Sequence, residues 1–182
     1  ERLQESDRIA ISERAVATEG ESAGLAAGQS YTVKDLMQAL LMVSSNDAAQ
    51  AFAERLGEKR FVDLMQEKAY AIGMKQTSFF DASGLSILNQ STPQDLAKLA
   101  VYINARHPDI FKITRQKTTV LAEQTSGTAR SMTNGNLFAG KPEFLGGRTG
   151  YTDEANGNLL TLFSYRGSVL IVVVMGTDDR FG

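Results

Sequence analysis

The spacing of apolar residues changes along this chain, and that change limits the folds open to it. Between residues 32 and 105 apolar side chains recur with a helical period. The clearest series is Val33, Leu36, Met37, Leu40 and Leu41. Three later runs, at 146–151, 158–165 and 168–175, have the alternating or continuously apolar pattern of strands. Helices followed by consecutive strands predict an α+β fold, with a helical subregion at 32–105 and sheet strands at 146–176.

Start and stop signals divide the helical subregion. Thr32 resembles an N-cap with an acidic residue three positions on, and Thr92-Pro93 is a second helix start. The polar triplet Ser44-Ser45-Asn46 interrupts the first helical pattern, which resumes at Asp47. A further helix is expected at 58–72, and His107-Pro108 should end the helix that begins at Thr92.

The strand predictions are shorter. Ile9 and Ile11 alternate with polar residues and should add a strand to the later antiparallel sheet. Phe79-Phe80 is a possible short strand within a loop at 74–91, and Lys117 to Leu121 is rich in strand-forming residues. Arg166-Gly167 is short enough to be a hairpin turn between the last two strands.

Composition excludes several classes of function. The 182 residues carry a net charge of −2, which gives no broad basic surface for nucleic acid. Cys is absent and His107 is the single His, so disulfides, thiolate metal sites and a Ser-His-Asp triad are not expected. The longest apolar run, Val169 to Met175, suits a buried strand rather than a membrane span. We expect no metal or cofactor.

Two short motifs carry the candidate chemistry. Ser44-Ser45-Asn46 lies where two predicted helices meet, and Arg148-Thr149-Gly150 begins a predicted strand after a double Gly. Alone, the first is more often a helix cap and the second an ordinary strand start. In this order and context they match the second and third motifs of penicillin-binding proteins, whose first motif is Ser-x-x-Lys.

The surrounding sequence resembles the D-alanyl-D-alanine carboxypeptidase family of low-molecular-mass penicillin-binding proteins over nearly the whole chain. The segments that carry this resemblance are Ala17-Thr18, 22–25, 31–36, 45–49, 73–77, 83–85 and 146–152. The resemblance implies the helix-plus-sheet transpeptidase fold shared with β-lactamases. It also implies removal of the terminal D-Ala from peptidoglycan stem peptides through an acyl-Ser intermediate, inhibition by β-lactams, and a place in the bacterial envelope, periplasmic or extracytoplasmic. Any membrane contact would come from segments outside these residues.

The resemblance also implies roles for residues of both motifs. Ser44 would relay protons between a catalytic Lys, the third-motif cation and the leaving amine. Asn46 would hydrogen-bond the substrate amide and the catalytic Lys. Arg148 and Thr149 would hold the terminal carboxylate of the substrate. Two further residues of the strand complete the expected substrate site: Gly150, which lets the substrate backbone approach, and Tyr151, whose backbone N–H would form half of the oxyanion hole.

Two departures from the family pattern bear on activity. Arg148 stands where Lys is usual; it suits a carboxylate but cannot relay a proton by losing its own. No Ser is followed by Lys at the third position, and the nearest pair, Ser30 and Lys34, is four apart. We therefore expect an internal fragment of the domain, 1–182, lacking both ends and inactive unless a missing segment is supplied.

Two alternatives stay open. A β-lactamase-like acyl-Ser hydrolase would need a water-activating carboxylate near Asn46, and none is evident in the sequence. A non-catalytic peptidoglycan-binding module would follow if the chain were complete. Among lesser candidates, Asn134 and Asn136 resemble a family segment that lines the cleft. The others are expected to be surface, capping, turn or solvated helix residues: His107, Asp47, Glu54, Asp153 and Glu154.

Overall fold

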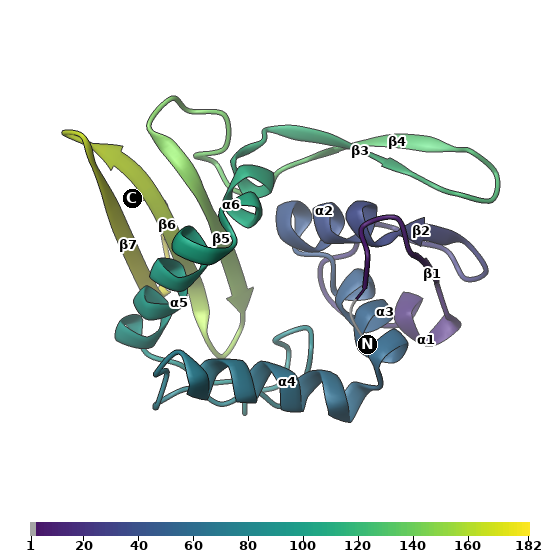
Figure 1. Ribbon diagram of the computed structural model, residues 1–182, viewed down its shortest axis with the longest axis horizontal. Coiled ribbons are helices and arrows are strands. Elements are labelled where there is room, and N and C mark those ends of the chain that lie inside the picture. Colours follow the sequence, from purple (N-terminus) through teal and green to yellow (C-terminus); the bar gives the residue numbers. More distant parts are fainter. Residues whose placement is uncertain (1–2) are drawn as a thin grey trace.

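The computed structural model describes residues 3–182, and these contain helices and three separate antiparallel sheets (Figure 1). The helices are α1 (Glu13–Val16), α2 (Val33–Val43), α3 (Asn46–Leu56), α4 (Glu58–Ala71), α5 (Pro93–Arg106) and α6 (Pro108–Arg115). The strands are β1 (Arg8–Ala10), β2 (Ser30–Thr32), β3 (Thr118–Ala122), β4 (Ala129–Thr133), β5 (Phe144–Thr152), β6 (Asn156–Tyr165) and β7 (Ser168–Thr177). The α+β prediction is confirmed.

Side-chain caps fix the starts of two helices where the sequence predicts them. Thr32 Oγ1 accepts a hydrogen bond from the backbone N–H of Asp35 at 3.0 Å. At the start of α5, Thr92 Oγ1 accepts from Asp95 N at 3.2 Å, with Pro93 in the first helical turn. Such caps satisfy backbone donors that have no partner within the helix, so they define where each helix begins.

One local prediction is confirmed and one is wrong. His107-Pro108 ends the helix that begins at Thr92: α5 stops at Arg106, and Pro108 opens the separate helix α6, where its missing N–H is tolerated in the first turn. Phe79-Phe80 forms no strand: the neighbouring pairing is a single bridge between Ser78 and Gln90, and the rest of the segment is loop.

The main sheet has the order β5-β6-β7, with both pairs antiparallel. Arg166 and Gly167 form the predicted tight turn, and their φ values of 50° and 78° suit a two-residue hairpin. Helices α5 and α6 pack against this sheet (Figure 1). A small cluster of Ala100, Phe111 and Leu162 forms the apolar contact between them.

The expected strand near Ile9 exists but does not join this sheet. β1 pairs with β2, and Ile9 lies opposite Tyr31. Both side chains are buried with apolar residues of α2 and α3 in the larger core cluster. Burial against these two helices, rather than alternation alone, therefore decides the partner of this strand.

Among the described residues, no helix is both long and apolar enough to cross a membrane.

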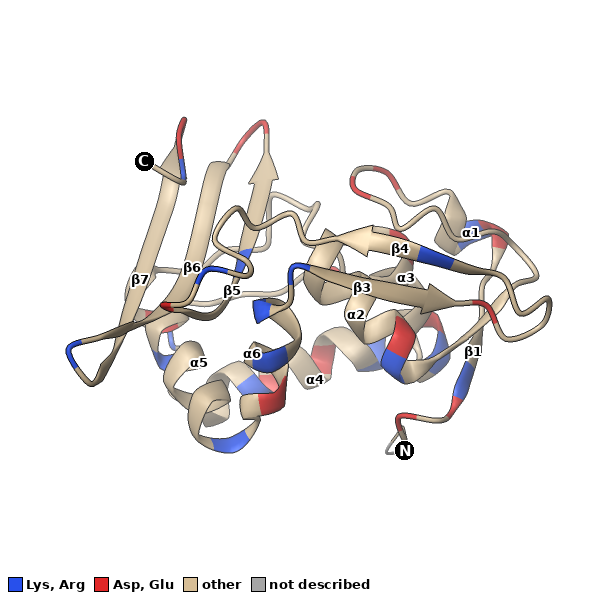
Figure 2. Ribbon diagram, turned by 90° about the horizontal axis from the view of Figure 1, so that it is seen from above, with Lys and Arg blue, Asp and Glu red and all other residues tan. Residues whose placement is uncertain are grey.

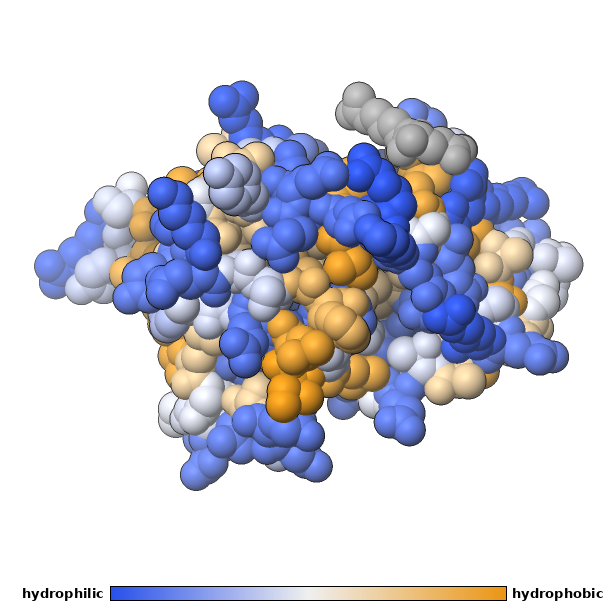
Figure 3. Space-filling view, turned by 90° about the horizontal axis from the view of Figure 1, so that it is seen from below, coloured by the Kyte–Doolittle hydropathy of each residue, from blue (hydrophilic) through white to orange (hydrophobic). Residues whose placement is uncertain are grey.

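On the face of the molecule that carries α4, apolar residues lie together among hydrophilic ones (Figure 3). The loop at 79–90 contributes exposed apolar side chains of Phe80, Leu85, Ile87 and Leu88. Exposed apolar residues occur on most soluble domains, so these side chains assign no partner by themselves.

A buried carboxylate attaches the β3–β4 hairpin to the N-terminal strands. Glu123 accepts hydrogen bonds from the backbone N–H groups of Ser30 at 3.0 Å and Thr125 at 2.8 Å. It also accepts from the N–H and the hydroxyl of Ser126. The bonds from Ser126 and Ser30 outweigh the effect of burial, so the pKa of Glu123 lies well below its usual range.

Replacing Glu123 with Gln should lower stability at neutral pH and make it less sensitive to acid. The folded-state pKa is lowered, so the carboxylate stabilises the fold above the unfolded pKa of about 4.3. That contribution is lost as pH falls through the folded value. Thermal unfolding of E123Q and the parent should therefore differ most near pH 7 and converge toward about pH 2. Glu143→Gln, at an exposed position, is the control. A difference in melting temperature between E123Q and the parent that does not change with pH would contradict the stabilising role of the Glu123 carboxylate.

Candidate active site

The turn between α2 and α3 holds the second motif, Ser44-Ser45-Asn46, in an unusual conformation. Ser44 ends α2 with φ 58° and ψ 33°, a left-handed conformation that Gly adopts more readily than Ser. Ser45 then caps α3, its Oγ accepting from Ala48 N at 3.1 Å. Backbone outliers of this kind gather at functional sites, where a specific side chain is worth the strain.

The double Gly before the third motif brings β5 against α6. At Gly146, whose φ is 145°, an added Cβ would lie 2.7 Å from the carbonyl oxygen of Phe111. Gly147 donates its N–H to Thr114 Oγ1 at 2.9 Å, and Thr114 is fully buried. This close approach fixes the position of β5 at the residue just before Arg148.

Arg148 joins the two motifs, which lie 104 residues apart. Its Nη1 donates to Ser44 Oγ at 3.0 Å and to the carbonyl oxygen of Leu41 at 2.9 Å. Leu41 belongs to the last turn of α2, where the helix dipole favours a cation. The structure thus brings Ser44 and Arg148 into contact, and it adds the Leu41 carbonyl, which sequence patterns could not have shown.

Arg148 is also the single charged residue in β5, β6 and β7, and charge elsewhere in Figure 2 lies mainly on helices, loops and strand ends. Burial lowers the pKa of its guanidinium to about 10, which leaves it protonated at neutral pH. Among the ion pairs found in the described residues, none involves Arg148. A desolvated cation bonded to neutral oxygens is suited to an anionic ligand.

The next residues continue along β5, which pairs only with β6 and is an edge strand of the described sheet. Thr149 and Gly150 lie opposite Leu159 and Asn158. Gly150 is exposed, and an added Cβ would have no neighbour within 4 Å, so space is open there. The Tyr151 side chain is 60% exposed and lies under the Arg180 guanidinium, 6.0 Å from the ring centre.

Asn46, the last residue of the second motif, is held by the segment at 19–21. Its backbone N–H donates to Glu21 O at 2.7 Å, and its side-chain Nδ2 donates to Glu19 O at 2.9 Å. Gly20 lies between these two residues, and an added Cβ there would sit 2.6 Å from Asn46 Nδ2. No hydrogen bond in the described residues links Asn46 to Arg148.

The prediction of a solvated helix charge is wrong for Asp47. Asp47 is only 1% exposed and is surrounded by hydrogen-bond donors. Burial acts to raise its pKa, but the hydrogen bonds from Ser22, Ser45, Ala23 and Leu25 outweigh it and lower the pKa. Glu54 is half-buried and accepts a hydrogen bond from the hydroxyl of Ser12, just before α1, at 2.6 Å. A charged residue in the first turn of an apolar helix is ambiguous in sequence, because a loop from elsewhere can cover it.

The segment with Asn134 and Asn136 closes over the ends of α2 and α6. Asn134 Nδ2 donates to the carbonyl oxygens of Thr114 and Gln116, both at 2.9 Å. Gly135 donates its N–H to Met42 O at 2.9 Å, one residue beyond Leu41. Asn136 is buried, and its Nδ2 has no hydrogen-bond partner among the described residues. These contacts make the segment a support for the α2 end.

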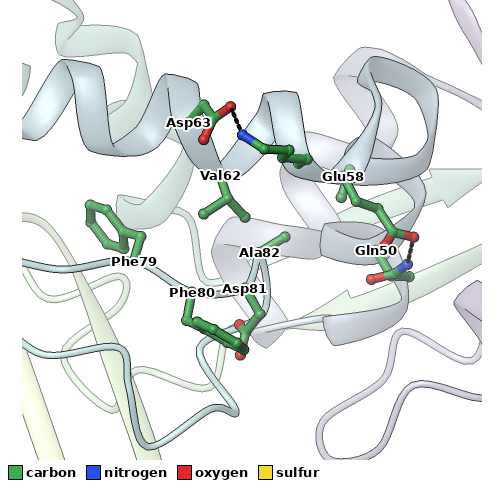
Figure 4. Close-up of a pocket in the computed structure, with 10 residues that line it drawn as sticks. Gln50, Glu58, Val62, Asp63, Phe79, Phe80, Asp81 and Ala82 are labelled. Atoms are coloured by element: carbon green, nitrogen blue, oxygen red, sulfur yellow. Dashed lines mark hydrogen bonds and ion pairs between the residues drawn. The ribbon is translucent and has the colours of Figure 1, made fainter.

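A pocket of about 400 Å³ lies elsewhere, between α3, α4 and residues 79–82 (Figure 4). Its carboxylates already have partners: Glu58 with Gln50 at 2.8 Å and Asp63 with Lys59 at 2.7 Å, both drawn in Figure 4. Among the described residues there is also no group of three or more His, Cys, Asp or Glu side chains that could hold a metal. The motif residues, not this pocket, are therefore the candidate site.

The chain is similar in sequence to known D-alanyl-D-alanine carboxypeptidases. A family model described as D-alanyl-D-alanine carboxypeptidase matches residues 1–179. The D-alanyl-D-alanine carboxypeptidase DacF of Bacillus subtilis is 32% identical over 181 residues, which are 97% of this chain and 46% of the relative. DacD of Escherichia coli is 31% identical over 85% of this chain and 40% of the relative. The chain thus spans about half the length of these curated relatives.

Solved structures agree as well. The DD-transpeptidase of Streptomyces K15 superposes with a TM-score of 0.87 at 26% identity, over 97% of this chain and 74% of that one. A D-alanyl-D-alanine carboxypeptidase of Mycobacterium tuberculosis gives 0.87 at 27% identity, over 95% and 66%. The fold is therefore that of the penicillin-binding proteins. Since the family model matches nearly the whole sequence, this chain belongs to the D-alanyl-D-alanine carboxypeptidase family.

Proposed function

We propose that this chain supplies the second and third motifs of a serine D,D-peptidase, which removes the terminal D-Ala from peptidoglycan stem peptides in the bacterial envelope. The observation that carries the proposal is the Arg148 guanidinium, bonded to Ser44 Oγ at 3.0 Å. This contact assembles two motifs from distant parts of the chain around one half-buried cation. Family membership adds the chemistry of the relatives, acyl transfer through a Ser.

The cation and the edge strand suit a peptide that ends in a carboxylate. Arg148 and Thr149 would bind that carboxylate by charge and hydroxyl, because a guanidinium forms strong charge-assisted hydrogen bonds with carboxylates. The substrate backbone would lie along β5 at Gly150, where no atom is within 4 Å of an added Cβ. The N–H of Tyr151 would supply half of the oxyanion hole.

Ser44 and Asn46 would complete the polar side of the cleft. Ser44 Oγ already accepts from Arg148, so its own proton is free to be donated toward a leaving amine. Since Arg148 stays protonated at neutral pH, Ser44 would relay a proton from a Lys rather than from Arg148. Asn46 would hydrogen-bond the substrate amide and that Lys through the parts of its carboxamide not used by Glu19 O.

The nucleophilic Ser and its Lys would come from residues outside 1–182, since no Ser-x-x-Lys occurs within them. The β-lactamase alternative needs a carboxylate free to activate water beside Asn46. Asp47 is adjacent, but its oxygens are occupied by protein hydrogen bonds. A non-catalytic peptidoglycan-binding module is the remaining alternative, and it predicts binding without acylation.

Intact mass after incubation with benzylpenicillin tests the proposal. The chain of residues 1–182 should gain no covalent adduct, while the longest natural protein that contains it should gain one penicilloyl group and release D-Ala from a peptide ending in D-Ala-D-Ala. Peptide mapping should place the adduct on a Ser outside 1–182.

Three other results would count against it. An adduct within 1–182 would mean a nucleophile other than Ser-x-x-Lys. Binding of the peptide by the longer protein without adduct or D-Ala release would favour the non-catalytic module. Hydrolysis of benzylpenicillin with rapid turnover, and little action on the peptide, would favour the β-lactamase alternative.

A further inference from the structure

The segment at 19–25 is attached to the second motif at two levels. At the surface, Glu19 O and Glu21 O accept from the side chain and the backbone of Asn46. Beneath them, a buried carboxylate, that of Asp47, holds the same segment. The proposed mechanism uses Asn46 but gives no role to Asp47 or to this segment.

Asp47 gathers donors from both sides of that junction. From the segment it accepts the hydroxyl of Ser22 at 2.6 Å and the N–H groups of Ala23 at 3.2 Å and Leu25 at 3.1 Å. From the α3 side it accepts the hydroxyl of Ser45 and the N–H of Ala48 at 3.0 Å. An ionised carboxylate only accepts hydrogen bonds, so it can satisfy all of these donors at once.

We propose that Asp47 is a positioning residue that sets the orientation of the Asn46 carboxamide, by anchoring segment 19–25 against the start of α3. The segment in turn presents the Glu19 carbonyl to Nδ2 of Asn46, at 2.9 Å. This bond directs one side of the carboxamide to the segment and leaves Oδ1 to accept from a donor in the cleft. The proposal rests on the proposed function only for the use made of Asn46.

Gly20 gives the same junction a steric test. A Cβ at Gly20 would lie 2.6 Å from Asn46 Nδ2, too close for the side chain to stay where it is. Gly28 offers a matched control, because its φ of 82° is close to the 86° of Gly20 and an added Cβ there meets nothing within 4 Å. G20A and G28A therefore share the backbone strain and differ in the contact with Asn46.

The first experiment measures geometry in the chain of residues 1–182. The variants are D47N, S22A and G20A, and the controls are D95N and G28A. Asp95 is a matched control for Asp47: it is also 1% exposed, lies in the first turn of a helix, and accepts from Gln76 N at 2.7 Å and Thr77 Oγ1 at 3.0 Å. The readouts are the NMR signals of the Asn46 side-chain amide and their exchange with solvent.

D47N and G20A should move the Asn46 side-chain signals and speed their exchange about tenfold, the effect of losing one typical hydrogen bond. S22A should do so to a smaller extent, and D95N and G28A should leave the signals in place. Unchanged signals in D47N and G20A would overturn the proposal, as would equal changes in D95N. If D47N fails to fold, S22A and G20A decide the same question.

The second experiment measures acylation by benzylpenicillin in the longest natural protein that contains this chain. G20A should lower the second-order acylation rate constant by about tenfold relative to G28A. If the Asn46 signals move but the rate constant does not, the positioning role in catalysis is wrong. If the unmodified longer protein is not acylated at all, the proposed function fails instead, and the first experiment still decides whether Asp47 orients Asn46.

Discussion

Replacing Arg148 with Ala should reduce kcat/KM for D-Ala release by about 100-fold in the longest natural protein that contains this chain. The change removes a half-buried cation that donates to both Ser44 Oγ and Leu41 O. Truncating one partner of a buried, hydrogen-bonded charge pair costs about 2–5 kcal/mol, and the substrate carboxylate would lose that partner. The measurement is steady-state release of D-Ala from a peptide that ends in D-Ala-D-Ala.

Arg148→Lys is the matched variant. Both hydrogen bonds of Arg148 come from the same atom, Nη1, so one ammonium group could replace them. Lys should therefore keep most of the activity, and the loss in R148A should appear with substrates that carry a free C-terminal carboxylate. A substrate with an amidated C-terminus should be processed slowly by the parent and little worse by R148A. Equal fold losses on both substrates would mean that Arg148 only supports the α2–α3 turn.

Folded stability must be measured beside activity, because Arg148 also holds the end of α2. Loss of the bond to Leu41 O leaves a helix C-terminus without its cation, which costs roughly 0.3–1 kcal/mol. The melting temperature of R148A should therefore be lower than that of the parent by a few degrees at most. R148A could instead fail to fold. If an additive that stabilises the fold without binding the active site then restores activity, Arg148 has a structural role.

Sequence alone predicted the parts of this fold that depend on local signals. The caps at Thr32 and Thr92 are confirmed because a hydroxyl and a backbone N–H three residues on are neighbours in any helix start. The hairpin at Arg166-Gly167 is confirmed for the same reason: two residues between strands leave few alternatives. The pairing of β1 with β2 was not predictable, because it depends on which helices bury Ile9.

The candidate site shows the same division. The two motifs were visible as residue types in order, and the family resemblance linked them. The Leu41 carbonyl was not visible, because any residue has one and only the tertiary fold brings it to Arg148. The burial of Asp47 could not be predicted, since its donors at 22–25 come from a segment whose position no local pattern fixes. Long-range hydrogen bonds to backbone atoms are the part of a site that sequence hides most completely.

Replacing Gly147 with Ala should destabilise the fold by about 3 kcal/mol, at the upper end of the cost of overpacking. An added Cβ would overlap the Leu160 carbonyl oxygen and would lie 2.9 Å from Thr161 Cα. Both are backbone atoms of β6, which cannot move without breaking the pairing with β5. For a chain of 182 residues the melting temperature should fall by roughly 6–12 °C.

Gly150→Ala is the control on the same strand, and it separates stability from function. An added Cβ at Gly150 meets nothing within 4 Å. The melting temperature of G150A should therefore differ from that of the parent by no more than the change expected for about 0.5 kcal/mol. If substrate lies along β5, however, G150A should lower kcat/KM, because the methyl group stands where the peptide backbone approaches. The main effect of G147A would then be a loss of stability, whereas G150A would lose activity alone. Equal melting temperatures for the two variants would contradict the packing argument, and full activity in G150A would place the substrate away from this edge.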